Sequence, residues 1–119
     1  MINRRQTFAR LVAGCLLFAC TNLAMAVGSG PKSIAKVETT DIFFTVYFSD
    51  GDIANTGCNQ ANMVVYWRSD FPNSYSTMLA TALTAFATGK KVEMWVEGCK
   101  ASPWGPTLPI PQSIVVTNG

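Results

Sequence analysis

The side chains that most often carry enzyme chemistry are scarce in this 119-residue chain, which contains no histidine. A Ser-His-Asp or Cys-His arrangement therefore cannot form. The carboxylates are scattered, and Asp50 and Asp52 flank Gly51 in what reads as a turn. The glycine-containing stretch at residues 51–57 lacks the lysine of a phosphate-binding loop. With no acid–base constellation, we expect a protein that is not an enzyme and carries no cofactor.

Aromatic side chains supply binding chemistry instead. Their flat apolar faces and polar edges stack on sugar rings or on bases. Trp95 is the most informative, because strand alternation places it on the polar face beside Glu93 and Glu97. For Trp104 the competing interpretation is a lid held by the prolines around it. The side chains expected to contact a ligand are Trp95, Trp104, Tyr47 and Tyr66.

The first 26 residues read as an export signal. Three arginines among residues 1–10 precede an uncharged, mostly apolar run at residues 11–20, which is too short to span a bilayer. Ala24 and Ala26 then form the small-x-small pattern that signal peptidase accepts. We expect cleavage after Ala26, leaving residues 27–119 as a single domain. This mature domain is periplasmic or secreted and has no transmembrane segment.

Export gives the four cysteines different roles. Cys15 and Cys20 belong to the leader, and in a second interpretation Cys20 is the acylated residue of a lipoprotein. Cys58 and Cys99 remain, and such a pair in an oxidising compartment predicts one disulfide. It would close a loop of about 40 residues and stabilise the fold by about 3–4 kcal/mol. Because the chain has no histidine, a zinc site lacks ligands, and we expect no metal.

Alternation of apolar and polar side chains predicts five strands in the mature domain. The strongest signal places Phe44 and Val46 on one face and Thr45 and Tyr47 on the other. Residues 101–111 contain four prolines and read as a stiffened loop. The expected strands are residues 34–40, 42–48, 63–68, 91–97 and 113–117.

One helix is expected between the third and fourth strands. Pro72 and a capping Asn73 or Ser74 mark its start, and Gly89 marks its end. Its apolar side chains recur at helical spacing and predict a buried stripe. The members of this stripe are Tyr75, Met78, Leu79, Ala82, Leu83 and Phe86.

The opposite face of this helix is unusual, because no charged residue occurs from Phe71 to Gly89. Small and hydroxyl-bearing side chains suit close approach of another surface, such as the same helix of a neighbouring subunit. The competing interpretation is a helix that is simply rich in threonine. The residues of the expected subunit interface are Thr77, Ala80, Thr81, Thr84 and Ala87.

Three strands, one helix and two strands are the order of the five-stranded OB barrel, in which the helix plugs the barrel. The expected fold is therefore mainly β with one helix, an OB-fold-like barrel of order β-β-β-α-β-β. A parallel sheet is disfavoured because only one helix is available. The expected core contains Phe44, Val46, Val65, Leu79, Leu83, Phe86, Val92, Met94, Val96 and Ile114.

With this order, the Gly57-Cys58 and Gly98-Cys99 pairs and the helix in view, the chain resembles small exported bacterial OB-fold proteins. It is similar in particular to the subtilase-cytotoxin-like B subunits of AB-type toxins. In those subunits a helix ends in a Thr-Gly turn and a strand follows, as at Thr88-Gly89 and Val92 here. The resemblance implies a homo-oligomer, a ring pentamer with helices around a pore, that binds cell-surface glycans and partners a toxin A chain.

Two functions follow from these observations. The first is an exported, glycan-binding subunit of the toxin-B type. The alternative is a periplasmic structural or interaction protein with no sugar site. Nucleic-acid binding is disfavoured, because the chain without its leader has six basic and seven acidic side chains and therefore no excess of positive charge.

Overall fold

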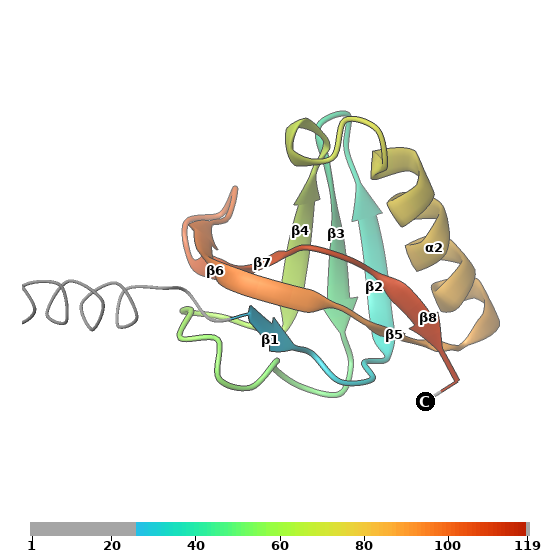
Figure 1. Ribbon diagram of the computed structural model, residues 1–119, viewed down its shortest axis with the longest axis horizontal. Coiled ribbons are helices and arrows are strands. Elements are labelled where there is room, and N and C mark those ends of the chain that lie inside the picture. The colour runs from blue at the N-terminus through green and yellow to red at the C-terminus, as the bar shows by residue number, and fades with distance from the viewer. Residues whose placement is uncertain (1–25, 119) are drawn as a thin grey trace, which may run out of the picture.

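The computed structural model describes residues 26–118, so the expected leader at residues 1–26 lies outside the described residues except for Ala26 (Figure 1). The described chain is mainly β and has a single α-helix, as expected. Within residues 26–118, no helix is both long and apolar enough to cross a bilayer. The elements are β1 (Ala26–Gly28), β2 (Ile34–Thr39), β3 (Phe43–Phe48), β4 (Met63–Trp67), the 3-10 helix η1 (Arg68–Asp70), α2 (Tyr75–Thr88), β5 (Lys91–Glu93), β6 (Trp95–Ala101), β7 (Thr107–Pro111) and β8 (Val115–Thr117).

The strands form three open antiparallel sheets, in the orders β2-β3-β4, β1-β6-β7 and β5-β8. Lys32, between β1 and β2, exchanges backbone hydrogen bonds with Val92 of β5. The segment that leads into β2 is therefore also hydrogen-bonded to β5, which belongs to a different sheet. In Figure 1 the band of β5, β6, β7 and β8 crosses in front of β2, β3 and β4. The expected closed five-stranded barrel is wrong, because these sheets stay open.

Two prolines in β7 explain why this strand does not pair with β4. The N–H and C=O of Thr107 both face the segment before β4, where they meet Asn59 and Gln60. Backbone groups of alternate residues in a strand point the same way, so the nitrogens of Pro109 and Pro111 also face the β4 side. Proline has no N–H to donate. A backbone ladder between β7 and β4 is therefore excluded, whereas the ladder between β7 and β6 remains intact.

The second half of the chain differs from the expected pattern in two places. The strand expected at residues 91–97 is divided into β5 and β6 at Met94, and β6 continues to Ala101. The loop expected at residues 101–111 contains β7. Proline is compatible with an edge strand when its nitrogen faces away from the neighbour, and the alternation rule used on the sequence does not register that geometry.

The core lies between the sheets and α2. Phe44 stacks on Tyr66 with 4.6 Å between ring centroids, and Tyr75 packs edge-on against Phe44. Phe44, Val46, Val65, Val92, Met94 and Val96 of the expected core are buried, and Leu79 and Ile114 pack partly buried against the core. The buried residues of the hydrophobic core are Phe44, Val46, Phe48, Ile53, Ala61, Val64, Tyr66, Tyr75, Ala82, Ala85, Val92, Met94 and Val96.

The orientation expected for the helix is wrong at its C-terminal half. Leu83 is 44% exposed and Phe86 is 47% exposed, so neither belongs to the core. The buried side is centred instead on Tyr75, Ala82 and Ala85. Small alanine side chains let the helix approach the strands closely, and the large apolar residues are displaced to its flank. The helix ends as expected at Gly89, whose φ of 68° is costly for other residues.

The expected disulfide between Cys58 and Cys99 is confirmed. It joins the segment before β4 to β6, with the two Cα atoms 5.6 Å apart and 41 residues of separation. Next to it, the side chain of Asn59 accepts hydrogen bonds from the backbone N–H and the hydroxyl of Thr107. These contacts hold the β4 side of the fold to β7, where no backbone ladder forms.

Leu83 and Phe44 provide a paired test of the core. Leu83→Ala should lower the free energy of unfolding by less than about 1 kcal/mol, because the side chain is already half exposed. Phe44→Ala should cost about 3–5 kcal/mol, because it leaves a cavity beneath Tyr66. Urea denaturation of the two variants measures both values. A cost of about 2 kcal/mol or more for Leu83→Ala would contradict the exposed position.

Replacing both Cys58 and Cys99 by alanine should lower the free energy of unfolding by about 3–4 kcal/mol, because the unfolded chain regains the freedom of a long loop. Denaturant unfolding of the double variant and of the unmodified protein measures the difference. Alkylation and mass spectrometry of exported, unreduced protein should find neither thiol free. Two free thiols would show that the bond does not form in the cell.

Candidate functional site

Trp95 opens β6 with its ring on the outer face of the sheet. Met94 and Val96 beside it are buried, whereas Trp95 is 57% exposed, as strand alternation predicts. Gly28 of β1 lies directly opposite. A Cβ atom at Gly28 would lie only 3.7–4.0 Å from carbons of the six-membered ring. The ring therefore lies over Gly28 on one side, at a distance that would just accommodate a methyl group, and much of the rest of it is exposed.

A hollow of about 240 Å³ lies beside this ring. The Ser113 hydroxyl accepts a hydrogen bond from the backbone N–H of Trp95 at 3.2 Å, and the Ser29 hydroxyl accepts one from the backbone N–H of Met94 at 2.9 Å. In the part of the chain that the structure describes, the carboxylate of Glu93 forms no ion pair. The principal lining residues are Gly28, Ser29, Glu93, Trp95, Ser113 and Val115.

This set of groups matches the needs of a polyhydroxylated ligand. The ring of Trp95 offers an apolar face to the C–H groups of a sugar. The carboxylate of Glu93 accepts hydrogen bonds from hydroxyl groups, and the Ser113 hydroxyl can donate one. Residues 26–118 hold no group of three His, Cys, Asp or Glu side chains that could bind a metal ion. The chemistry available beside Trp95 is thus stacking together with hydrogen bonding to a carboxylate and a hydroxyl group.

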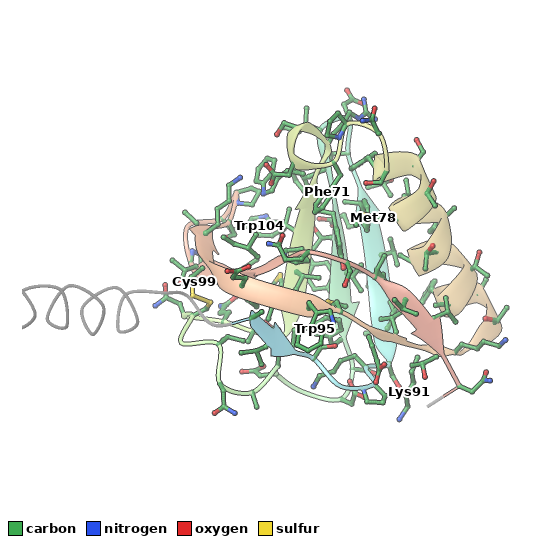
Figure 2. All side chains as sticks on the ribbon, viewed as in Figure 1. Phe71, Met78, Lys91, Trp95, Cys99 and Trp104 are labelled. Carbon is green, nitrogen blue, oxygen red and sulfur yellow. A yellow bond between two sulfur atoms is a disulfide. The ribbon has the colours of Figure 1, made fainter. Side chains whose placement is uncertain are left out.

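Trp104 lies elsewhere on the molecule, at the turn between β6 and β7 (Figure 2). It is 49% exposed, and its backbone N–H donates to the Ser102 hydroxyl. Its ring meets the ring of Phe43 edge-on at 6.2 Å, and Phe43 in turn contacts Trp67 at 5.1 Å. Trp104 therefore belongs to an aromatic cluster at the end of the sheets, separate from Trp95.

The two tyrosines are placed differently again. Tyr66 is fully buried, and its hydroxyl donates to the Ser113 carbonyl at 2.9 Å. Burial raises the pKa of its phenol. The ligand contact expected of Tyr66 is wrong, because its side chain holds the core and reaches no solvent. Tyr47 is half-buried under the Lys36 ammonium, 4.4 Å from the ring centroid, and burial together with the Glu38 carboxylate raises the pKa of Tyr47.

The helix face expected at a subunit interface is accessible. Thr81 is half-buried, and the other members, Thr77, Ala80, Thr84 and Ala87, are exposed. The Thr81 hydroxyl donates to the Thr77 carbonyl at 2.9 Å, so part of the polar surface is satisfied within the helix. The sequence pattern placed Leu83 and Phe86 in the buried stripe, whereas the structure exposes them, so they add apolar surface to the exposed side of α2.

Gln112 was also missed by the sequence reasoning. Its backbone N–H donates to the Trp95 carbonyl at 2.8 Å, so it follows β7 as the cross-strand neighbour of Trp95. The signal that could have found it is the Pro-x-Pro-Gln stretch read as a strand rather than as a loop.

The two exposed tryptophans, Trp95 and Trp104, thus lie in different places, and the exposed Phe86 lies apart from both on α2. The place around Trp95 combines a ring with a hollow and polar side chains, and the place around Trp104 is a cluster of rings. Comparisons with protein-family models, curated proteins and solved structures find no match to the chain.

Proposed function

We propose that the chain is an exported carbohydrate-binding protein whose sugar site is built around Trp95. The observation that carries this proposal is the half-exposed ring of Trp95 beside a hollow lined by Glu93 and Ser113. A tryptophan in such a position normally has a partner, and the neighbouring carboxylate and hydroxyl suit sugar hydroxyl groups. No step of this binding needs a metal, a cofactor or a catalytic base.

Export is part of the proposal. Cleavage after Ala26 would leave Val27 and Gly28 in place, and these are the β1 residues that pair with Val96 and Trp95. The backbone on which the Trp95 ring rests would thus survive removal of the leader. The disulfide between Cys58 and Cys99 supports an oxidising compartment, because such bonds are rare in reducing ones.

The fold itself is proposed to be an open relative of the OB barrel. β2, β3 and β4 follow one another in one sheet, β1 pairs with β6, and β6 pairs with β7. β7 lies beside β4, and α2 packs across β2, β5 and β8. An OB barrel would have these neighbours with closed ladders. This arrangement supports the relation to toxin-type B subunits, and therefore a cell-surface glycan as the ligand.

The sugar site can be tested with matched tryptophan variants. Trp95→Ala should abolish binding on a glycan array, whereas Trp95→Phe should keep a weaker signal because a flat ring remains. Trp104→Ala is the control, because it removes a second half-exposed tryptophan from a different place. Circular dichroism should show all three variants folded. A Trp95→Ala protein that is folded and still binds the same glycans would exclude this site.

A second function is favoured by a different observation, the exposed and uncharged outer side of α2. Leu83 and Phe86 lie on this helix with Thr84 and Ala87 and carry no charge that would keep a neighbour away. We propose that copies of the chain associate through α2, in a ring of the toxin-B type that could also carry a catalytic partner chain. Association without a sugar site would correspond to the alternative, an interaction protein.

Association predicts a specific response to charge. Thr84→Lys would bring like charges together between neighbouring helices and should dissociate a ring into monomers. Ala54→Lys is the control, because Ala54 is exposed in a loop away from α2. Light scattering of the unmodified protein and both variants measures the masses. If the unmodified protein is a monomer at micromolar concentration, the ring is excluded, whereas the sugar site at Trp95 is unaffected.

A further inference from the structure

We propose that the sugar site at Trp95 continues across β6 and β7 into a second subsite formed by Gln112, Lys100 and Asp70, so that the ligand is an oligosaccharide of at least two units. This inference rests on the proposed function and specifies its ligand. It depends on three features of the described residues: a cross-strand pair, a bulge in β6 and a second hollow.

The cross-strand pair joins the two subsites. Val96 and Pro111 are partners in the ladder, and both are buried. The next pair is Trp95 and Gln112, linked by the hydrogen bond from the Gln112 N–H to the Trp95 carbonyl. Directly opposite residues project to the same face of a sheet. Both of these side chains are exposed, so Trp95 and Gln112 start from adjacent positions on the same outer surface.

The bulge brings Lys100 to that same surface. Trp95 and Lys100 are five positions apart, so they would lie on opposite faces of a regular strand. The register between β6 and β7 shifts between Val96 and Cys99, at Gly98 with φ of 72°. After this shift, Lys100 pairs with Leu108, which shares a face of β7 with Gln112. The inserted residue thus aligns Lys100 with Trp95 and Gln112.

A second hollow, of about 360 Å³, lies beyond Gln112. The Lys100 ammonium is 3.6 Å from the Asp70 carboxylate and 5.0 Å from the centroid of the Trp67 ring. Both members of this ion pair are nearly half exposed, so each has polar capacity left for a ligand. The residues that line the hollow are Asp70, Phe71, Lys100, Ile110, Pro111 and Gln112.

The chemistry of this second hollow favours a neutral sugar unit. Lys100 and Asp70 compensate each other, which removes the net charge that would select an anion or a cation. Together with the Gln112 amide they offer donors and acceptors to adjacent hydroxyl groups. Phe71, Ile110 and Pro111 supply apolar surface for the C–H groups of the ring. The combination repeats, with different residues, what Trp95, Glu93 and Ser113 offer in the first hollow.

An extended peptide does not fit the adjoining groove between β4 and β7. Cα atoms of these strands approach within 8 Å, whereas an inserted strand needs two spacings of about 4.8 Å. A strand paired with the edge of β7 that faces β4 would also find no N–H donor at Pro109 or Pro111. Peptide binding by strand addition is therefore disfavoured, and the surface suits a ligand held by side chains.

The test compares short and long saccharides by isothermal titration calorimetry. The probes are galactose with lactose, N-acetylglucosamine with chitotriose, and glucose with maltotriose, applied to the mature protein and its variants. The longer member of the bound pair should bind more tightly. Gln112→Ala should weaken the longer ligand about tenfold, the loss of one or two hydrogen bonds, and leave the monosaccharide unchanged. Asp70→Asn should act in the same direction.

The control is Gln60→Ala, which removes an exposed glutamine side chain outside both hollows and should change neither affinity. Equal affinity for short and long ligands would overturn the second subsite, and so would equal weakening of both by Gln112→Ala. In either case Trp95-dependent binding would still support the proposed function. Absence of binding to every probe and to the glycan array would overturn the proposed function, and the second subsite with it.

Discussion

The absence of two backbone donors in β7 is the constraint on which the rest of the structure depends. Pro109 and Pro111 occupy positions whose nitrogens face β4, so the ladder that would close the barrel cannot form there. β7 still pairs with β6, because the prolines are placed where that ladder needs no N–H. The seam between β4 and β7 stays open as a result. The hollow lined by Lys100, Asp70 and Gln112 lies at this seam, and Pro111 is part of its lining.

Contacts other than a ladder hold the seam together. At one end, the disulfide of Cys58 and Cys99 and the bonds of Asn59 to Thr107 fix the start of β7. At the other end, the buried hydroxyl of Tyr66 donates to the Ser113 carbonyl just after β7. Burial keeps this phenol protonated, because it raises the pKa of Tyr66. The two sheets are therefore joined at both ends of β7, and the region between them is free of backbone pairing.

Local pattern predicted β2, β3, β4 and the outward position of Trp95, because each depends on alternation within a short stretch. The disulfide was predicted from the two cysteines left in the expected mature chain, whereas β1 and β7 were not expected as strands. Local pattern failed where the outcome depends on neighbours far along the chain. Leu83 and Phe86 continue a good apolar stripe, but the strands beneath α2 accept Ala82 and Ala85 instead. Tyr66 is of a residue type that often binds sugars, but here its side chain is buried in the core. Gln112 and Lys100 join the site only through the register of β6 against β7, and no rule based on one strand contains that register.

Trp95 has a structural role as well as a proposed ligand, and the two are compatible. Its ring lies over Gly28, where an added Cβ atom would meet the ring carbons at ordinary van der Waals distance. β1 is a three-residue edge strand. The Trp95 ring shields the hydrogen bonds between β1 and β6 from water, and this contact in turn holds the ring in place. A ring held in this way loses little conformational freedom when a ligand stacks on it, and rigid aromatic surfaces bind at low entropic cost. The bulge at Gly98 brings Lys100 to the same face of β6 as Trp95, where it lines the second hollow. The position of the Trp95 ring thus depends on the pairing of β6 with β1, and the position of Lys100 depends on the bulge at Gly98.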